Sequence, residues 1–379
     1  MFIYKDMNIA VFFGGKSCEH EISIISGVQT LCEISGKHNV LPVYIDKNNE
    51  WFLPEDSKNV KSYINFKSKK KLGIDVGTPY ITKNVFGKFK RFFHVDCAII
   101  CCHGMHGEDG TLAGLLELCD IPYSCPSVLS SALCMDKVFM KKMFFSGGFN
   151  SAKYITIIKN NYKNNAEITL QQIENQIGFP LIVKPANLGS SIGINKCNSV
   201  HELKFALEVA FSFDSKILIE TFLENSQEIN CAIVGNLQKK YCSNLQQPQS
   251  WQSFLTFEEK YLTSKKTKIQ NNNIAKKLQN QIYKLSENLF DYFDCKGVIR
   301  IDYLVKDNII YVNEINTIPG SLSFPLWDNI FSPAELINKL IELAIQDKIK
   351  KDENVFSYQS VALQNYKPSL KTKFNKLKK

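Results

Sequence analysis

The stretch Gly297–Asn316, GVIRIDYLVKDNIIYVNEIN, decides how this sequence is expected to fold. Two apolar runs flank the turn residues KDN, which predicts a β-hairpin. Arg300 and Asp302 stand two apart on the first strand, and Glu314 and Asn316 stand two apart on the second. Because side chains two apart share a face of a strand, all four are expected on one side. With a three-residue turn, position 300 faces 314 and position 302 faces 312.

The opposite side of this hairpin is expected to be core. It carries Ile299, Ile301, Tyr303, Ile309, Tyr311 and Ile315. Two carboxylates and an amide oxygen at a sheet end are hard ligands suited to Mg²⁺ that holds phosphates. Two ions about 3.5–4 Å apart could share Glu314. A surface hairpin with chance charges is the alternative, and the strict separation of polar and apolar faces favours the metal site.

Strands and helices alternate ahead of the hairpin. Apolar runs at 8–13, 41–46 and 96–102 predict strands, and helix-period residues after the first run predict a helix. A strand, a helix and a strand in this order indicate a parallel βαβ unit. Residues 47–94 are polar and lysine-rich, with hairpin-like fragments.

The second half continues with strands and capped helices. Strands are expected at 153–158, 179–185, 217–223 and 229–235. A helix is expected over 130–145, ended by the glycine pair that follows. Capping patterns predict further helix starts near Thr169, Ser199 and Ser332.

Two glycine-containing stretches could bind phosphate. The GGKS at 14–17 resembles the end of a P-loop, but a P-loop needs a glycine at position 10, where the chain has Ala10 inside a strand. A tight strand-to-helix turn is the favoured interpretation, with Glu19 in the first helical turn at the ligand-binding edge of the sheet. Lys184 followed by Gly189 and two serines is a better phosphate site, although such a loop can also be only a connection.

The stretch CCHGMHGEDG at 101–110 raises the possibility of zinc. Its candidate ligands are Cys102, His103, His106 and Asp109, and their spacing fits no standard zinc finger. The glycines and the position after a strand favour a loop that faces a ligand.

Composition excludes some classes of protein. The net charge is +9, but residues 350–379 hold eight lysines and two acids, and residues 57–73 hold six lysines and no acid. This distribution favours a solvated tail and loop over a nucleic-acid surface. No apolar run is long enough to span a membrane. Twelve scattered cysteines without a C-x-x-C motif indicate reduced thiols, and therefore a cytoplasmic location.

The ordered motifs FFGGKSCEHEIS, HGMHGEDGTLAG, SALCMDK, LIVKPANLGSSIGI, ILIETFLE, FEEKYL, VIRIDY and NEINTIPGS resemble the D-alanine–D-alanine ligase family of the ATP-grasp superfamily over about residues 7–349. The resemblance implies an α/β (α+β) fold of three domains, with a parallel βαβ domain at 1–130. Two ATP-grasp lobes at 131–223 and 224–349 would hold nucleotide between them, followed by a lysine-rich, mobile tail at 350–379.

The resemblance also implies a chemistry. ATP phosphorylates the carboxylate of one D-alanine, and the amine of a second attacks the acyl phosphate to form the dipeptide used for peptidoglycan precursors. The implied partners are D-alanine, ATP and two Mg²⁺ or Mn²⁺ ions, with a possible homodimer and no nucleic acid or membrane.

Residue roles follow by matching the motifs. Substrate and closing loop would be held by Glu19, His103, Ser190 and Tyr261. Phosphates would be neutralised by Lys137, Lys184 and Lys260. Adenine would be recognised by Glu220 and the backbone near Leu223, and the ribose by Glu228. The metals would be bound by Asp302, Glu314 and Asn316, and the oxyanion by Arg300 and the N–H of Gly320.

One departure concerns the second substrate. The family usually carries a serine–leucine pair that grips its carboxylate, and the corresponding residues here are Pro325 and Leu326. The acceptor could therefore be D-serine, D-lactate or another amino acid. Other classes considered are a non-catalytic nucleotide-binding regulator and a nucleic-acid binder acting through the tail; the complete set of metal-ligand residue types argues against the regulator.

Overall fold

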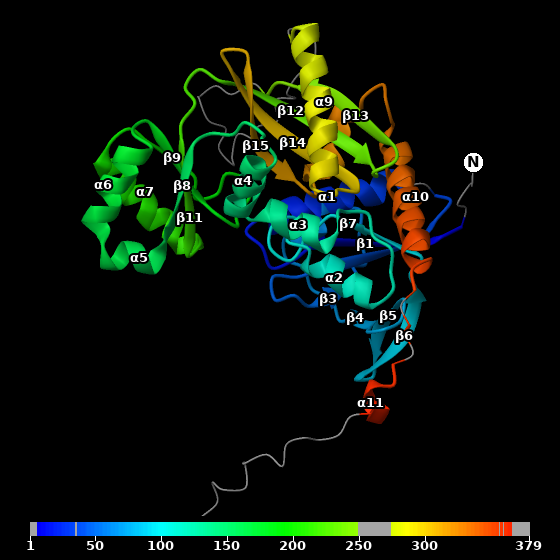
Figure 1. Cartoon of the computed structure of the whole chain (residues 1–379). Helices are drawn as coiled ribbons and strands as arrows, with labels where there is room; N and C mark the ends of the chain where they lie inside the picture. The colour runs from blue at the N-terminus through cyan, green and yellow to red at the C-terminus, as the bar shows by residue number, and fades with distance from the viewer. Residues whose placement is uncertain (1–5, 35, 249–273, 356, 359, 366–379) are drawn as a thin grey trace, which may run out of the picture.

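The computed structural model describes residues 6–34, 36–248, 274–355, 357–358 and 360–365. Three β-sheets organise these residues, one of seven strands and two of four. Figure 1 shows the first sheet in blue and cyan, a green lobe to its side, and the third sheet with yellow and orange elements above it. The expected mixed α/β fold is confirmed.

The first sheet has the strand order β6-β5-β4-β3-β2-β1-β7. Its strands are β1 (Asn8–Gly14), β2 (Asn39–Ile45), β3 (Trp51–Phe52), β4 (Lys71–Asp75), β5 (Tyr80–Val85), β6 (Lys88–His94) and β7 (Cys97–Ile100). β1 pairs in parallel with β2 and β7, so the βαβ unit around α1 (His20–Glu33) is confirmed. The hairpin-like fragments at 47–94 extend the same sheet as antiparallel strands.

The second sheet has the order β10-β9-β11-β8. Its elements are β8 (Tyr154–Ile158), α5 (Lys159–Asn164), α6 (Ala166–Gln176), β9 (Leu181–Pro185), β10 (Asn195–Cys197), α7 (Val200–Phe213) and β11 (Lys216–Thr221). Ile173 of α6 and Leu207 of α7 join Val183 and Ile219 of the strands in one apolar core. Ser199 caps α7 as expected, accepting a hydrogen bond from the Glu202 N–H.

The third sheet has the order β13-β12-β14-β15. Its strands are β12 (Gln227–Gly235), β13 (Lys240–Gln246), β14 (Gly297–Lys306) and β15 (Ile309–Asn316). One face packs on α9 (Lys276–Tyr292), where Ile282 and Leu289 meet Ile299 and Ile301. The 3₁₀ segment η3 (Gly320–Trp327) follows β15, and α10 (Pro333–Asp352) starts at the expected Ser332 capping box.

The remaining helical elements are η1 (Val60–Tyr63), α2 (Thr111–Leu118), α3 (Val128–Met135), α4 (Lys137–Ser146) and α11 (Ala362–Asn365). α10 continues to Asp352, so the first three residues of the tail expected from residue 350 are helical. Residues 366–379 of that tail lie outside the described residues.

The register of the β14–β15 hairpin differs from the expected one. The turn has two residues, Asp307 and Asn308, both with positive φ (51° and 63°), which matches the twist of the strands. Arg300 faces Asn316 and Asp302 faces Glu314, and the register shifts between Asp302 and Tyr303. Sequence spacing could not reveal this bulge, which leaves one extra residue on β15.

The bulge also changes which residues are core. Val312 is buried in the apolar cluster under the sheet, whereas Ile309 is 45% exposed. The expectation that Ile309 and Tyr311 are core is therefore wrong, because Tyr311 is only half-buried and lies outside the apolar cluster. Arg300, Asp302, Glu314 and Asn316 do share one face, opposite Ile299, Ile301, Tyr303 and Ile315.

Two helix predictions are also wrong. The single helix expected at 130–145 is two helices, because Asp136 is extended and its carboxylate caps α4 by accepting the N–H groups of Val138 and Phe139. Thr169 does not begin a helix. Its hydroxyl donates to the Asn165 carbonyl one turn back, inside α6.

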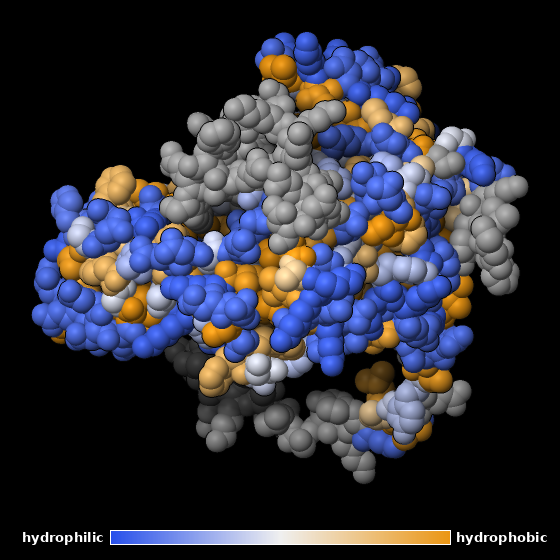
Figure 2. Space-filling view, turned by 90° about the horizontal axis from the view of Figure 1, so that it is seen from above, coloured by the Kyte–Doolittle hydropathy of each residue, from blue (hydrophilic) through white to orange (hydrophobic). Residues whose placement is uncertain are grey.

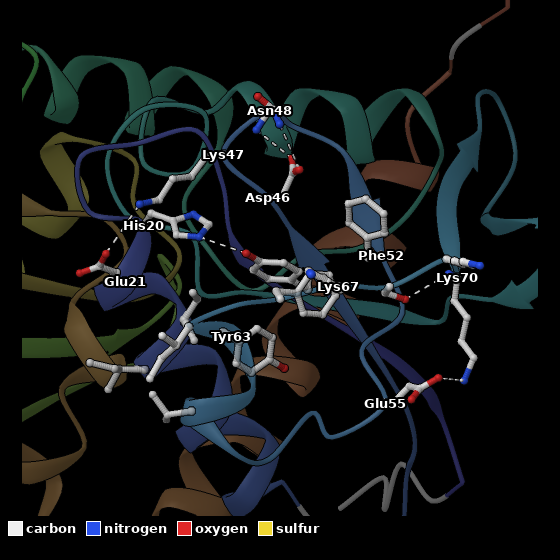
Figure 3. Close-up of a pocket in the computed structure, with 18 residues that line it drawn as sticks. His20, Glu21, Asp46, Lys47, Asn48, Phe52, Glu55, Tyr63, Lys67 and Lys70 are labelled. Atoms are coloured by element: carbon white, nitrogen blue, oxygen red, sulfur yellow. Dashed lines mark hydrogen bonds and ion pairs between the residues drawn. The ribbon is translucent and has the colours of Figure 1, made fainter.

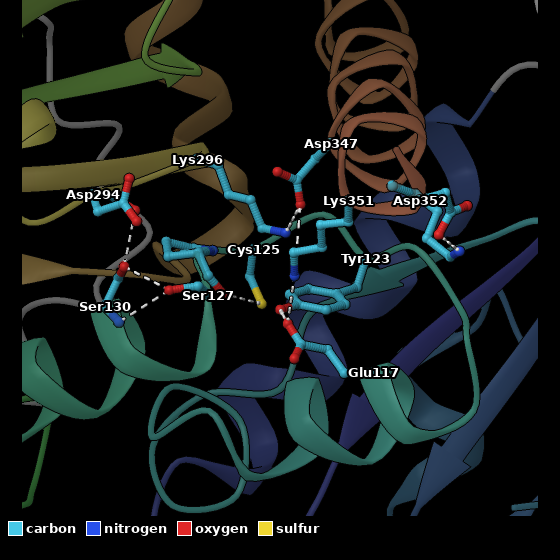
Figure 4. A network of polar contacts seen from close by, with 12 residues as sticks. Glu117, Tyr123, Cys125, Ser127, Ser130, Asp294, Lys296, Asp347, Lys351 and Asp352 are labelled. Atoms are coloured by element: carbon cyan, nitrogen blue, oxygen red, sulfur yellow. Dashed lines mark hydrogen bonds and ion pairs between the residues drawn. The ribbon is translucent and has the colours of Figure 1, made fainter. Parts of the chain in front are cut away.

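A polar network joins the N-terminal part of the chain to its C-terminal part (Figure 4). The Tyr123 hydroxyl donates to the Glu117 carboxylate at 2.5 Å, and Lys351 of α10 donates to the same carboxylate at 2.9 Å. Lys296 pairs with Asp347 of α10 and lies over the Tyr123 ring, 4.3 Å from its centroid. α10 also packs on the first sheet through Leu336, Ile337 and Leu340, in a shared cluster with β1.

Hydrophilic residues predominate on the face shown in Figure 2, with apolar residues scattered among them. All twelve cysteines are free thiols, and most are buried. Among the described helices, none combines the length and apolar content that crossing a bilayer requires.

Candidate active site

One face of the β14–β15 hairpin carries a compact group of polar side chains. We call this face, which holds Arg300, Asp302, Glu314 and Asn316, the acidic face. The Arg300 guanidinium donates to both carboxylate oxygens of Asp302, at 2.7 and 2.8 Å. The Asn316 amide also donates to Asp302, at 3.1 Å. Glu314 lies directly opposite Asp302 in the strand register. The structure therefore brings together all four hairpin residues predicted for the site.

Two lysines from other elements reach this face. Lys137, the first residue of α4, lies with its Nζ 3.4 Å from the Glu314 carboxylate and donates to the Leu188 carbonyl at 2.9 Å. Lys184 of β9 donates to the Asn313 side chain at 3.1 Å. Asn313 is the extra residue of the β15 bulge, so the irregularity aims its side chain at the second sheet.

A buried ion cluster lies behind these lysines. The Glu220 carboxylate of β11 pairs with Lys141 at 2.6 Å and with Lys184. Burial alone would raise the pKa of Glu220, but the two ammonium groups outweigh it and hold this pKa at about 2. Burial lowers the pKa of Lys141 in spite of its acidic partner. Glu220 is therefore a permanent anion whose two oxygens are held by two different cations.

The loop after β9 closes on the end of α1. The Ser190 hydroxyl donates to the carboxylate of Glu19, which is buried at the N-cap of α1. A side chain at Gly189 would collide with the same carboxylate. Ser190 and Ser191 have left-handed backbones, with φ of 51° and 60°, an unfavourable conformation found mostly at functional loops.

A directed hydrogen-bond relay links three segments beside Glu19. His103 Nδ1 lies 2.9 Å from the Ile318 carbonyl, and its Nε2 lies 2.7 Å from Ser26 Oγ. Ser26 Oγ also accepts the Ser321 N–H at 2.9 Å. Burial lowers the pKa of His103 to about 4, so the ring is neutral at pH 7. Because a carbonyl only accepts, Nδ1 carries the proton and Ser26 donates to Nε2.

The relay changes the interpretation of His103 and its loop. Both ring nitrogens bind protein groups, so in this structure His103 holds the segment after β15. Asp109 likewise supports the His103 loop, because its carboxylate accepts the N–H groups of His106 and Thr111 at 2.8 and 2.9 Å.

The segment that the relay holds is strained. Gly320 begins η3, and the next three residues, Ser321 to Ser323, have φ of 51°, 49° and 54°. Left-handed backbone is unfavourable for residues with side chains, so their neighbours must impose it. Pro325 is exposed, whereas Leu326 is buried in the cluster shared with β1 and α10.

Glu108 is a further buried acid near this site. It accepts the Gly104 N–H at 2.8 Å. Burial and then the charge of Glu19 raise the pKa of Glu108 to about 8. The Glu108 carboxyl is therefore protonated near pH 7.

Other predicted residues lie along the edge of the second and third sheets. Leu223 is half-buried in the connection between β11 and β12, and Glu228 is the second residue of β12. Lys260 and Tyr261 lie outside the described residues.

Sequence reasoning missed four residues of the site: Lys141, Ser26, Glu108 and Asn313. Only Lys141 carried a usable signal. It follows Lys137 by four residues, so both ammonium groups lie on one helix face.

Two four-stranded sheets face each other here, one carrying the acids and the other buried lysines, next to a parallel βαβ unit. This arrangement is that of an ATP-grasp ligase. Residues 8–126 match the family described as D-ala D-ala ligase N-terminus, and residues 143–346 match D-ala D-ala ligase C-terminus. The chain belongs to the D-alanine–D-alanine ligase family.

Individual relatives agree with this assignment. The chain is 36% identical to a D-alanine–D-alanine ligase of Thermosipho melanesiensis, over 90% of this chain and 94% of the relative. It is 35% identical to one of Caldicellulosiruptor bescii, over 93% and 98%.

Solved structures are similar along nearly the whole chain. The D-alanine–D-alanine ligase of Coxiella burnetii superposes with a TM-score of 0.77 at 26% identity, covering 92% of this chain and 97% of that one. The VanG D-Ala:D-Ser ligase of Enterococcus faecalis gives 0.76 at 28% identity, covering 90% and 100%.

Proposed function

We propose that this protein joins two D-alanine molecules at the expense of ATP and supplies the dipeptide for peptidoglycan precursors. The carboxylate of the first D-alanine attacks the γ-phosphorus of ATP, giving an acyl phosphate and ADP. The amine of the second attacks the acyl carbon, loses a proton, and phosphate leaves. The convergence of Arg300, Asp302 and Glu314 with Lys137 and Lys184 is the observation that carries this proposal.

The first D-alanine is assigned to Glu19. Glu19 is a buried carboxylate at a helix start, next to Glu108, and a carboxylate is the side-chain group that pairs with a substrate ammonium. Ser190 fastens the loop of the second sheet onto Glu19, so loop closure and substrate binding use the same carboxylate. Tyr261 is assigned to the same hydrogen-bonded set by resemblance. His103 acts there by holding the segment that contains Gly320.

ATP is assigned to the space between the second and third sheets. Lys137 and Lys184 are buried cations beside the acidic face and neutralise phosphate charge, with Lys260 added by resemblance. Adenine would be recognised by Glu220 and the backbone near Leu223, and ribose by Glu228. The lysines that hold Glu220 fix its orientation for this contact.

The donor set of the acidic face fits magnesium. Asp302, Glu314 and Asn316 offer only oxygen donors, and two of them are acids stabilised here by nearby cations, Arg300 and Lys137. These three residues would hold two Mg²⁺ or Mn²⁺ ions. Such ions, when bound, neutralise and orient the ATP phosphates.

The oxyanion of the tetrahedral intermediate is assigned to Arg300 and the Gly320 N–H. Arg300 is held by two hydrogen bonds to Asp302, and Gly320 by the relay through Ser26. Donors fixed before the reaction stabilise developing charge without reorganisation.

A second candidate reaction uses another acceptor. Pro325 offers neither hydroxyl nor N–H for the second carboxylate, and one structural relative is described as a D-Ala:D-Ser ligase. D-serine, D-lactate or a further amino acid would then replace the second D-alanine.

The organisation of the protein is proposed on the same basis. Domain boundaries near residues 130 and 223 separate the first sheet from the two ATP-grasp lobes. A homodimer in the cytoplasm, acting without nucleic acid or membrane, is expected from the resemblance.

Phosphate release from ATP and Mg²⁺ tests the proposal. Release should depend on D-alanine and should not respond to L-alanine. Equal release with neither amino acid would contradict the ligase reaction. Mass spectrometry of products, with D-alanine as the fixed first substrate and a panel of acceptors, then identifies the second substrate.

A further inference from the structure

A large cavity lies beside α1, away from the acid–lysine site. Its volume is about 1170 Å³. Figure 3 shows its walls, which come from α1, the end of β2, η1 and the segment 66–70. Most of the wall belongs to the segment 47–94, which carries none of the shared sequence motifs. We refer to this space, lined by residues from His20 to Lys70, as the aromatic cavity.

Aromatic rings form one wall of the aromatic cavity. Phe66 is the centre of the group, with its ring 4.4 Å from Tyr44, 5.7 Å from Phe52 and 5.9 Å from Tyr63, measured between centroids. The Tyr63 and Phe66 rings are stacked, with an interplanar angle of 9°. Exposed apolar side chains, Val60 and Ile64, continue this wall. Such a surface suits a planar apolar group.

The inner end of the cavity is fixed in place. The ring of His20 lies 2.7 Å from the Gly15 carbonyl through Nδ1 and 3.2 Å from the Tyr44 hydroxyl through Nε2. His20 and Tyr44 are both buried. A wall held by hydrogen bonds needs little ordering when a ligand binds, which lowers the free-energy cost of binding.

The rim of the cavity carries excess positive charge. Lys47 pairs with Glu21 at 3.6 Å, and Lys70 pairs with Glu55 at 3.0 Å. Within the described part of the chain, no ion pair is formed by the exposed Lys67 and Lys69. The remaining acid of the lining, Asp46, accepts the N–H groups of Asn48 and Glu50, both at 2.8 Å. Four lysines against three acids in the lining leave a formal net charge of +1, and a positive excess beside an apolar wall favours an anionic ligand.

We propose that the aromatic cavity binds a small organic anion with a planar apolar body, at a site separate from the ligase active site. The half-buried rings Phe52 and Phe66, backed by the buried Tyr44 and Tyr63, take the planar body. Lys67 and Lys69 take the anionic group. Neither set takes part in the proposed ligase reaction.

Fluorescence titration of the full chain with anilinonaphthalene sulfonate tests this site. The expected result is one saturable site that persists with saturating ATP and Mg²⁺. The double variant Lys67→Glu/Lys69→Glu should weaken sulfonate binding by about tenfold, because attraction becomes repulsion at the rim. Phenylnaphthylamine, which has the same rings without the sulfonate, should bind wild type and variant within about twofold.

A matched control uses two other exposed lysines. Lys88→Glu/Lys90→Glu makes the same charge change on β6, beside the exposed Phe89 and Phe92, and should leave the titration unchanged. Three outcomes would overturn the proposal: displacement of the probe by ATP, unaltered binding in the Lys67→Glu/Lys69→Glu variant, or equal weakening by the Lys88→Glu/Lys90→Glu control.

Discussion

Lys141 and Glu220 form an ion pair in which Nζ lies 2.6 Å from Oε1 and neither side chain is more than 2% exposed. The pair joins α4 to β11 and therefore links two elements that border the proposed nucleotide site. Lys184 contacts the other oxygen of the same carboxylate. If ATP binds as proposed and draws Lys184 toward its phosphates, Lys141 alone would balance the charge of Glu220.

Replacing Lys141 with Met should destabilise the protein and weaken ATP binding. Removing one partner of a buried ion pair costs about 3–5 kcal/mol when the other charge is left uncompensated, and the loss here should be smaller because Lys184 still pairs with Glu220. Urea unfolding measures the loss of stability, and initial rates give the KM for ATP, which should rise. Lys142→Met, at the exposed neighbouring position, should change neither. If the double variant Lys141→Met/Glu220→Gln is no more stable than Lys141→Met, the ion pair between Lys141 and Glu220 does not contribute to stability.

Replacing Ser26 with Ala should lower kcat about tenfold with a smaller effect on KM. The change leaves His103 Nε2 and the Ser321 N–H unpaired, at a cost of about 1–3 kcal/mol, next to the proposed Gly320 oxyanion donor. Steady-state kinetics check the split between kcat and KM. Thr30→Val is the control, because Thr30 is an equally buried hydroxyl one turn along α1 that bonds the Ser26 carbonyl. An equal loss of kcat in the control would assign the effect to helix packing.

Replacing Arg300 with Ala should reduce kcat by about 10²–10³, the usual effect of losing an oxyanion donor. Arg300→Lys keeps the charge but cannot make the paired contacts with Asp302. Its kcat should therefore lie between the values for wild type and for Arg300→Ala. Urea unfolding of all three proteins separates catalysis from folding. A near-native kcat for Arg300→Ala would remove this residue from the oxyanion site.

The fold was predictable where one segment determines its own structure. Alternating apolar residues placed β14 and β15, and the serine capping patterns located the starts of α7 and α10. Asp136 misled the prediction because its capping of α4 depends on an extended backbone that composition does not reveal. The β15 bulge could not be predicted from local sequence, because its extra residue, Asn313, contacts Lys184 on another sheet.

The site was predictable where residue types recur at fixed spacing. Asp302, Glu314 and Asn316 emerged from a period of two, and the motifs supplied Glu19 and Ser190. Ser26 and Glu108 could not be found in this way, because their roles arise from contacts with residues distant in sequence, such as Ser321, 295 positions away from Ser26.

The stability of the protein should depend on His103 as the pH falls. The pKa of His103 is about 4 in the folded protein and 6.5 in the absence of burial. Between these values the unfolded chain binds a proton that the folded chain does not, so the free energy of unfolding falls as the pH drops from about 6.5 toward 4. The difference corresponds to about 3 kcal/mol at most.

Urea unfolding at pH 7.5, 6 and 5 checks this expectation. The free energy of unfolding should fall less steeply with decreasing pH in His103→Gln than in wild type. The exposed His201 on α7 provides a control, and His201→Gln should follow wild type. Parallel curves for His103→Gln and wild type would show that His103 titrates alike in both states.

Glu314→Gln should weaken the binding of divalent metal and leave the fold intact. Glu314 is half-buried opposite Asp302 in the strand register, and its carboxylate is 3.4 Å from Lys137 Nζ. The amide keeps the shape of the side chain but loses the charge that a divalent ion requires. The Mg²⁺ concentration for half-maximal rate should therefore rise, by at least about tenfold, and direct titration with Mn²⁺ in the presence of ATP should show weaker binding.

Glu224→Gln, in the exposed connection between β11 and β12, removes the same charge outside the site and should leave both titrations unchanged. If the Glu314→Gln titration also matches wild type, Glu314 serves only to position Lys137, and the metal ligands reduce to Asp302 and Asn316.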